Sequence, residues 1–416
     1  MRIRLKYGTG EVGGELPSDW RVAELAPPPR PALQNPAATL EAFFSAPVGG
    51  PPFDRVADGW RGVCVIVPDI TRKAGTHLLL PPLLARLERL GLGPERVTIV
   101  FASGIHPPQT EEQKKSIVGE GVFSRYRCLE HNARETCVPR GGVALNPHVA
   151  AADGIIVIGS VKAHYLAGFG GGRKALLPGV ASHEECLRLH RLSLNPDAPG
   201  RHPRIGPGIL AGNPMHETSL AAAKAAGIGF CINTVLDPAD RIIFLNAGDL
   251  ERSHAGACRF VEGYQGAPLD APADAVIASC GGFPSDINFI QSHKGLDNSC
   301  HAARDGGVVL LVSECSAGIG NPDFLNWFGY PDVAAMDRAL RQAFVINGQT
   351  AMATREKTLR CRVALLSALP AEDARRMGMT PVRSLEEGIA FCRSIAGDAA
   401  KTVLLPDAGL VLPMCR

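Results

Sequence analysis

Residues 162–182 (KAHYLAGFGGGRKALLPGVAS) gather side chains that could do chemistry: His164, Lys174 and five glycines, with His190 a little downstream. Glycine lets a backbone approach a ligand closely and adopt positive φ without steric cost. A loop of this kind after a strand is a common phosphate site. Two known phosphate motifs fail, because Ala175 replaces the hydroxyl residue of a Walker A loop and Arg173 replaces the last glycine of a dinucleotide fingerprint. The loop therefore holds another ligand or is a structural turn.

Two more polar groups follow apolar runs that are typical of strands. Asp69-Ile70-Thr71-Arg72 comes after the run at 62–68, and its carboxylate and guanidinium could hold a ribose diol and an anion. The alternative is a local ion pair at the start of a helix. His106 follows the run at 96–103 between a glycine and a proline, which suits acid–base work or a hydrogen-bonded loop histidine.

A fourth polar group stands in the second half of the chain, within residues 279–294 (SCGGFPSDINFIQSHK). Gln291 and Lys294 are three residues apart, so on a helix they share one face. Together they could bind a substrate carboxylate, or they could form an ordinary solvated helix face.

His190 lies in a helical run beside leucines, where a lone histidine would usually be a core residue.

The elements that position these groups alternate regularly. We predict strands at 62–69, 96–103, 153–161, 230–236, 241–245, 273–279, 307–313, 362–366 and 402–405, with helices at 77–92, 111–118, 183–192, 216–227, 253–264, 286–304, 332–344, 348–360 and 384–396. This alternation predicts the α/β class, with two doubly wound domains of parallel-type sheets and an active-site cleft between them. In such sheets ligands bind at the carboxyl ends of strands, where all four polar groups fall.

The break at 265–272 (QGAPLDAP) sets the predicted domain boundary. We expect an N-terminal cofactor-binding domain over 1–266 and a C-terminal α/β domain over 272–404. The tail, 405–416, is expected to pack back on the N-terminal domain. Residues 1–7 are expected to form an edge strand, and the proline- and alanine-rich segment 25–55 is expected to wrap the surface.

Composition excludes several classes of protein. The net charge of +2 gives no strong attraction to nucleic acid, and no apolar run of 18 residues predicts a membrane span. The start does not look like a secretory signal. None of the 12 cysteines forms a C-x-x-C pair, which argues against a zinc ribbon or iron–sulfur cluster. Free buried thiols fit a cytoplasmic protein best.

The order of these motifs resembles the nickel-dependent lactate racemase family. D-x-T-R at 69–72, G-x-H at 104–106, the GGRK loop, a histidine sixteen residues after its lysine, and QSxK at 291–294 occur in that order, and the match spans nearly the whole chain. The segments GGRKALLPGVAS and SCGGFPSDINFIQSHK are similar to signatures of that family.

The resemblance implies a cofactor and its ligands. Lys174 would carry pyridinium-3,5-bisthiocarboxylic acid mononucleotide, the nickel-pincer nucleotide, through a thioamide link. His190 would complete the coordination of the nickel, a metal that suits a nearly planar site with soft donors. The residues implied to contact the nucleotide are Asp69, Ile70, Thr71, Arg72, Gly171 and Gly172.

The resemblance also implies a reaction. His106 and His164 would be the acid–base pair, and Arg72, Gln291 and Lys294 would bind the substrate carboxylate. The enzyme would be an isomerase, a racemase or epimerase that inverts C2 of a 2-hydroxy acid by hydride transfer to and from the cofactor, which does the hard step. Its partners would be a small 2-hydroxy acid and the proteins that make and insert the cofactor.

Three positions depart from lactate racemase itself and leave the substrate open. Ile290 stands where that enzyme has an aromatic residue, Pro107-Pro108 replaces an arginine-containing pair, and 348–360 lacks a tryptophan. The substrate could be a short aliphatic, malate-like or sugar 2-hydroxy acid. Three other functions stay open: a nicotinamide-dependent 2-hydroxy acid dehydrogenase, a non-catalytic nucleotide or metal carrier, and a relative that works without nickel.

Overall fold

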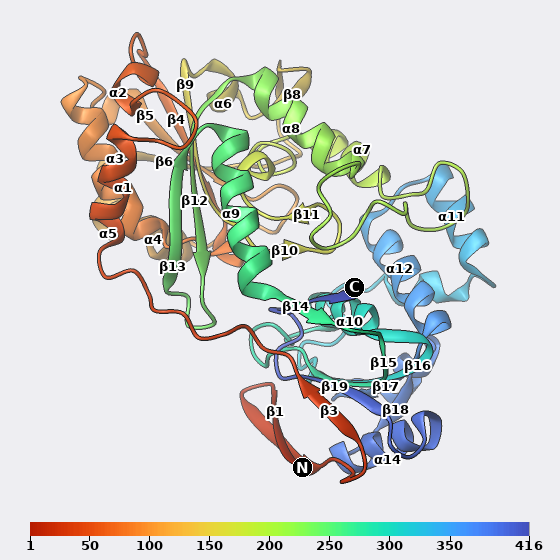
Figure 1. Ribbon diagram of the computed structural model, residues 1–416. Coiled ribbons are helices and arrows are strands. Elements are labelled where there is room, and N and C mark those ends of the chain that lie inside the picture. The colour runs from red at the N-terminus through yellow and green to blue at the C-terminus, as the bar shows by residue number, and fades with distance from the viewer. Residues whose placement is uncertain (416) are drawn as a thin grey trace. The chain divides into compact units, whose positions relative to one another are not determined.

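Two six-stranded sheets organise the chain, as the computed structural model, which describes residues 1–415, shows (Figure 1). The first sheet belongs to a compact unit of Pro29–Leu192 and Arg204–Gly263, here called the first unit. The second sheet belongs to a unit made of Met1–Pro28, Ser193–Pro203 and the described residues from Tyr264 onward, here called the second unit. Each unit has its own sheet, with an apolar core on each face of it.

The sheet of the first unit has the order β13-β12-β9-β4-β5-β6. Its strands are β4 (Val63–Pro68), β5 (Val97–Ala102), β6 (Arg127–Glu130), β9 (Gly154–Ser160), β12 (Ile228–Leu236) and β13 (Ile242–Gly248). All neighbours run parallel except β12 and β13. Along the chain, β5 and β6 are added on one side of β4, and β9 and then β12 are added on its other side. The strand order therefore reverses beside β4.

Alternate residues of each strand bury opposite faces of this sheet. Val65 points into a core that α1 (Pro36–Ser45) and α3 (Thr76–Arg89) cover, whereas its neighbour Ile66 points into a second core. That second core is covered by α7 (His183–Arg191) and α8 (Pro214–Ala226). A strand buried on both faces reads as a continuous apolar run, which is why the sequence predicts these strands well.

The other elements of the first unit are shorter or peripheral. They are α2 (Phe53–Val56), η1 (Ile70–Arg72), η2 (Pro94–Arg96), α4 (Glu111–Val118), α5 (Glu120–Arg125), β7 (Val138–Arg140), β8 (Val143–Leu145), α6 (Pro147–Ala151), β10 (Ala163–His164), β11 (Gly168–Phe169), η3 (Gly172–Ala175) and α9 (Leu250–Gln265), which ends in the second unit.

The sheet of the second unit is parallel throughout, in the order β18-β17-β16-β15-β19-β3. Its strands are β3 (Arg21–Glu24), β15 (Ala273–Ser279), β16 (Ala303–Val312), β17 (Arg362–Leu366), β18 (Thr380–Val382) and β19 (Lys401–Leu405). The remaining elements are β1 (Arg2–Tyr7), β2 (Gly10–Glu15), β14 (Gly266–Leu269), α10 (Phe289–Ala302), η4 (Leu325–Gly329), α11 (Val333–Gln342), α12 (Ile346–Arg360), α13 (Ala371–Arg376), α14 (Leu385–Ala396) and β20 (Leu412–Cys415).

The second sheet is also covered on both faces. The helices α10, α11, α12 and α13 contribute to one core, and α14 with the β1–β2 hairpin contributes to the other. In the hairpin, Ile3 and Leu5 are buried while Arg2, Arg4 and Lys6 are exposed, which is the period-two pattern of a strand with one face on a core. None of the helices in residues 1–415 is long and apolar enough to cross a membrane.

The α/β class and the two parallel-type sheets agree with the prediction, but the division of the chain differs from it. The first 28 residues group with the second unit, because β3 pairs with β19 at the edge of the second sheet. Ser193–Pro203 joins that unit as well. The predicted linker at 265–272 contains β14, and β20 of the tail pairs with it within the second unit rather than packing back on the N-terminal domain. Arg416 lies outside the described residues.

The segment 25–55 was expected to wrap the surface, and here the prediction was wrong. It contains α1, whose Leu40 and Phe44 are fully buried beside Phe53 and Phe230. The helix begins after Asn35, whose side chain accepts a hydrogen bond from Ala38 N, and has proline in its first turn. The prolines that suggested a loop therefore stand where a helix tolerates them.

Candidate active site

Three loops of the first unit leave neighbouring parallel strands at the same edge of the sheet. β9, β4 and β5 are adjacent, so the segments that follow Ser160, Pro68 and Ala102 lie side by side at their carboxyl ends. These segments carry residues 162–182, here called the Gly-rich loop, and the side chains of Asp69 and His106. The position is the one where open α/β sheets bind ligands, beside the strand at which the order reverses.

Asp69 and His106 form a direct pair. The Asp69 carboxylate contacts His106 Nδ1; the Asp69 side chain is 2% exposed and the His106 side chain 42% exposed. Asp69 Oδ1 also accepts hydrogen bonds from Thr71 N (2.9 Å) and Thr71 Oγ1 (2.7 Å). Burial raises the pKa of Asp69, but these hydrogen bonds and the charges of His106 and Arg72 outweigh it, so the pKa ends below its ordinary value. The group is therefore an ionised carboxylate that holds an imidazole.

A second layer fixes the two loops that carry this pair. Ile70 N donates to Gln109 Oε1 at 2.7 Å, and Gln109 N donates to the Glu130 carboxylate at 2.8 Å. The same carboxylate accepts from Ser103 Oγ at 3.2 Å and pairs with Lys114 at 2.7 Å. Glu130 ends β6, so three strand ends are tied together beneath the site. The sequence reasoning missed Gln109 and Glu130, although Gln109 stands only three residues after His106.

The Gly-rich loop folds back on itself over β9. Residues 163–164 and 168–169 pair as the short hairpin β10–β11, and Gly170 N donates to Lys162 O at 2.9 Å. Gly171 and Gly172 have φ of +73° and +51°. A Cβ on Gly172 would lie 2.8 Å from His254 Cδ2, and one on Gly171 would lie 2.7 Å from Val161 Cγ2. Packing alone therefore requires glycine at both positions.

Arg173 is the internal support of this loop. Its side chain is 1% exposed, and its guanidinium donates to Ala167 O at 2.7 Å. His254 Nε2 lies 2.8 Å from Arg173 NH1 and 2.8 Å from Gly170 O. Burial lowers the pKa of Arg173 to about 10, so it stays charged at neutral pH. Burial, followed by the charge of Arg173, lowers the pKa of His254 well below its ordinary value, which keeps that ring neutral. The sequence analysis gave neither residue a role.

His190 lies near the end of α7 and is partly buried. Its Nδ1 donates to Cys186 O at 2.7 Å, so the proton is on Nδ1 and Nε2 keeps its lone pair. Burial lowers the pKa of His190 to about 4, and the nearby charges of Lys174 and His106 act in the same direction. The imidazole is thus neutral at pH 7, and Lys174 and His106 are close enough to influence it.

Comparison with known protein families identifies the chain. Residues 7–200 match the model of the lactate racemase N-terminal domain, and residues 269–412 match that of the lactate racemase C-terminal domain. The chain belongs to the lactate racemase family. It is therefore an isomerase, a racemase.

Individual members of the family agree with this assignment. Lactate racemase from Thermoanaerobacterium thermosaccharolyticum is 30% identical over 447 aligned residues, covering 99% of this chain and 98% of the relative. Lactate racemase from Lactiplantibacillus plantarum is 30% identical over 386 residues, covering 89% of each. The solved lactate racemase apoprotein from T. thermosaccharolyticum superposes with a TM-score of 0.89 at 27% identity and covers both chains fully. A Thermotoga maritima protein with a TM-score of 0.62 at 18% identity shares the fold.

The first unit brings together most of the site residues predicted from the sequence. Asp69, Thr71 and Arg72 are joined by hydrogen bonds, and Arg72 donates to Thr71 Oγ1 at 3.0 Å. Ile70 lies in the same turn, and its side chain packs against the apolar core. His164 and the half-buried Lys174 share the Gly-rich loop with Gly171 and Gly172.

The remaining two predicted site residues lie in the second unit. Gln291 and Lys294 stand on the first turns of α10, where Lys294 Nζ donates to Gln291 Oε1 at 2.9 Å. Asn288 caps this helix by accepting from Gln291 N at 3.0 Å. The i, i+3 spacing therefore does place the two polar groups on one helix face, as the sequence predicts.

The donor atoms of the first unit fit the nickel cofactor that the family resemblance implies. His190 Nε2 is a neutral imidazole nitrogen whose ring is oriented by a carbonyl, which is the usual arrangement of a metal ligand. Among the side chains that the structure describes, no group of three or more His, Cys, Asp or Glu is arranged to hold a metal ion. The half-buried Lys174 has an amine that could be linked to an organic group, and its charge acts on His190.

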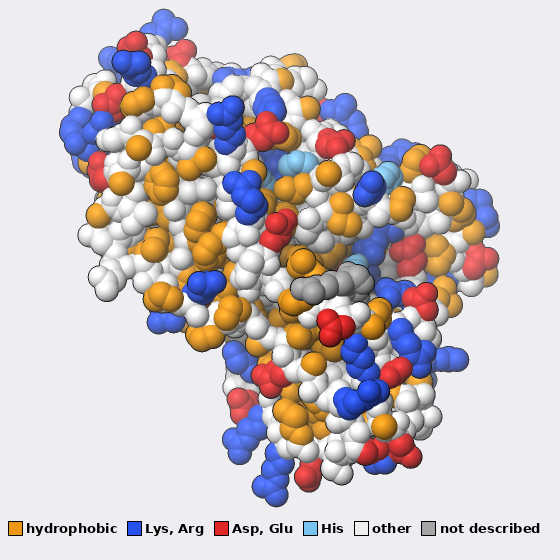
Figure 2. Space-filling model, in the orientation of Figure 1, with side chains coloured by type: hydrophobic (Ala, Val, Ile, Leu, Met, Phe, Trp, Pro, Cys, Tyr) orange, Lys and Arg blue, Asp and Glu red, His pale blue; other side chains and the backbone are white. Residues whose placement is uncertain are grey.

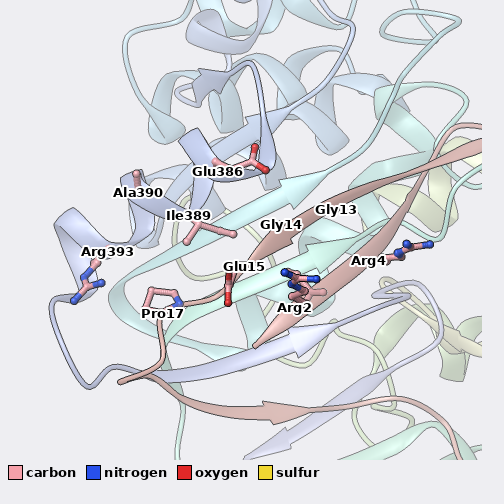
Figure 3. A pocket seen from close by; sticks show the side chains of 11 residues that line it. Arg2, Arg4, Gly13, Gly14, Glu15, Pro17, Glu386, Ile389, Ala390 and Arg393 are labelled. Carbon is pink, nitrogen blue, oxygen red and sulfur yellow. The ribbon is translucent and has the colours of Figure 1, made fainter.

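The hollow in Figure 3 is a poorer candidate for the active site. It lies in the second unit between the β1–β2 hairpin and α14, and basic Arg2, Arg4 and Arg393 share it with acidic Glu15 and Glu386. None of the predicted site residues lines it, and neither does any histidine or cysteine.

The face of the molecule in Figure 2 carries Lys, Arg, Asp and Glu interspersed, without a large field of one sign. Such a surface gives no strong attraction to polyanions.

Proposed function

We propose that the protein inverts C2 of a small 2-hydroxy acid, with Lys174 carrying the nickel-pincer nucleotide and His190 binding its nickel. The observation that carries the proposal is that the Asp69–His106 pair and the loop of Lys174 follow neighbouring strands, and that the charges of Lys174 and His106 both act on His190 of α7. The names of the relatives make lactate the first substrate to test. When bound, the nickel-pincer nucleotide supplies an acceptor and donor for the hydride on C2.

In this proposal the protein handles the hydroxyl proton. His106 and His164 are the acid–base pair, and the Asp69 carboxylate stabilises the His106 imidazolium that forms when Nε2 accepts a proton. Proton transfer by a positioned side chain contributes about 10²–10⁴-fold to a rate. His106→Ala should therefore lower turnover by at least about 100-fold, and it should leave metal content unchanged because His106 is not a proposed ligand.

Arg72, Gln291 and Lys294 are the proposed carboxylate-binding residues. A guanidinium can bind a carboxylate through two hydrogen bonds, whereas an ammonium acts as a point charge. Arg72 already donates to Thr71, which holds its side chain near the Asp69–His106 pair. Proteins that make and insert the cofactor are the partners that this function requires.

The test is chiral analysis of a panel of 2-hydroxy acids, using protein produced together with the cofactor pathway. Each single enantiomer of lactate, a longer aliphatic acid, malate and a sugar acid is incubated with the protein. Conversion of one of them to a mixture of enantiomers or epimers supports the proposal. Accumulation of a ketoacid only when NAD is added would support a dehydrogenase instead, and no turnover by metal-loaded protein would support a carrier.

A further inference from the structure

His106 has a fixed tautomer in this structure. Its Nδ1 contacts the Asp69 carboxylate, and that carboxylate is buried, ionised and held by two hydrogen bonds from Thr71. A carboxylate can only accept a hydrogen bond, so Nδ1 must carry the proton. The neutral ring then has its lone pair on Nε2, where it can accept a proton from a ligand.

His164 has the opposite constraint. Its Nδ1 lies 3.2 Å from Leu166 N and 3.2 Å from Ala167 N, both within the turn between β10 and β11. Backbone amides can only donate, so Nδ1 of His164 must supply the lone pair. A neutral His164 therefore carries its proton on Nε2. The ring of Tyr165 lies against it, with centroids 5.3 Å apart and an interplanar angle of 21°.

We infer that the two histidines are unequal in the resting enzyme: His106 presents a proton acceptor, and His164 presents a proton donor. Asp69 is the positioning residue for His106, and the Leu166 and Ala167 amides position His164. This inference deepens the proposed function and rests on it for its catalytic meaning. It also gives Asp69 a role that differs from the nucleotide contact expected from the sequence.

The inequality has a consequence for the two enantiomers. A substrate whose hydroxyl faces His106 meets an unprotonated nitrogen, so its proton can leave without any prior change in the protein. A substrate whose hydroxyl faces His164 meets an N–H, which can only donate to it. For His164 to accept, its proton must first move from Nε2 to Nδ1 through solvent, and both amide hydrogen bonds must break. The resting site is thus set for one hydroxyl orientation.

The tautomers can be measured without cofactor or turnover. The protein is produced without the cofactor pathway and with ¹⁵N-labelled histidine, and two-bond ¹H–¹⁵N correlation spectra above pH 7 show which ring nitrogen carries the proton. His106→Gln and His164→Gln assign the two rings among the 12 histidines, because each variant removes one set of signals. The expected result is a proton on Nδ1 of His106 and on Nε2 of His164.

Asp69→Asn supplies the matching perturbation. The asparagine can turn its amide N–H toward Nδ1, so His106 should switch to the Nε2–H tautomer while His164 stays unchanged. Asp237→Asn is the control, because the Asp237 carboxylate also accepts two hydrogen bonds at one oxygen, from Ala239 N and Arg241 N, and its hydrogen bonds stay within residues 237–241. It should leave both rings as they are.

Two results would overturn the inference: the same tautomer at both histidines of the wild-type protein, or an unchanged His106 ring in folded Asp69→Asn. The proposed function can fail separately. Opposite tautomers in a protein that, once loaded, racemises no 2-hydroxy acid would support the inference and reject the function. Racemisation by a protein with equal tautomers would do the reverse.

Discussion

Replacing the buried Asp297 carboxylate on α10 by the isosteric amide should lower the free energy of unfolding strongly. Its side chain is fully buried, and its Oδ1 lies 2.7 Å from Lys357 Nζ and 3.1 Å from Arg201 NH1. Lys357 is itself only 6% exposed, and Arg201 is 19% exposed. Arg201 belongs to Ser193–Pro203, the segment that leaves the first unit after α7, so this carboxylate ties that segment to α10 and α12.

Asp297→Asn would keep the shape of the side chain and remove its charge. The buried Lys357 and the partly buried Arg201 would then both lose this negative charge. Removing one partner of a buried ion pair costs about 3–5 kcal/mol. With an m-value of about 3 kcal/mol per M in urea, the unfolding midpoint should fall by about 1–1.7 M.

The assay is urea unfolding followed by tryptophan fluorescence. Two of the three tryptophans, Trp20 and Trp327, lie in the same unit as Asp297, so their part of the signal reports on that unit, whereas Trp60 reports on the first unit. Asp305→Asn is the matched control, because Asp305 pairs with Arg360 at 2.6 Å but is 88% exposed. An exposed pair contributes at most about 1 kcal/mol. Equal midpoints for the two variants would refute the reasoning from burial.

The same site makes a prediction about pH. Burial raises the pKa of Asp297, but the charges of Lys357 and Arg201 outweigh it and hold the pKa far below its ordinary value. A carboxyl whose pKa is lower in the folded state contributes stability above its unfolded pKa of about 3.9 and loses it as the pH falls. The stability difference between wild type and Asp297→Asn should therefore be constant near neutral pH and shrink below about pH 4.

Two further predictions concern the loop and the metal ligand. Gly172→Ala should lower the melting temperature more than Gly91→Ala does. Both glycines have positive φ (+51° and +80°), but of the two only a Cβ at 172 would meet another side chain, that of His254 at 2.8 Å. Equal melting temperatures for the two variants would mean that the loop adjusts to the added methyl group. His190→Ala should lose nickel, measured as metal per protein, while Lys174 keeps its adduct in intact mass, and full nickel occupancy would exclude His190 as the ligand.

The sequence predicts the strands and strand ends of this fold because those features are local. Buried parallel strands such as β4 read as continuous apolar runs, and polar residues that follow them must lie at one edge of the sheet. The prediction that Asp69, His106 and the Gly-rich loop gather there depends only on that rule. The spacing of Gln291 and Lys294 predicts in the same local way that they share one helix face, where the structure joins them by a hydrogen bond.

Features that depend on distant residues could not be predicted in this way. β3 joins a sheet whose other strands begin some 250 residues later, and no pattern within residues 21–24 indicates that partner. The Asp69–His106 contact joins residues 37 apart and changes the interpretation of both. Arg173 offers a similar lesson, since an arginine beside Lys174 suggests an exposed cation, whereas the structure buries it against His254.

The central claim is that Lys174 carries the cofactor with which this racemase works. Protein produced together with the cofactor pathway can be analysed by intact mass and peptide mapping, beside Lys174→Ala and Lys174→Arg, the second of which keeps the positive charge. We predict an added mass on the peptide that contains Lys174 in the wild type, and neither the added mass nor racemisation in either variant. The same added mass on both variants, or on a different wild-type residue, would contradict the claim.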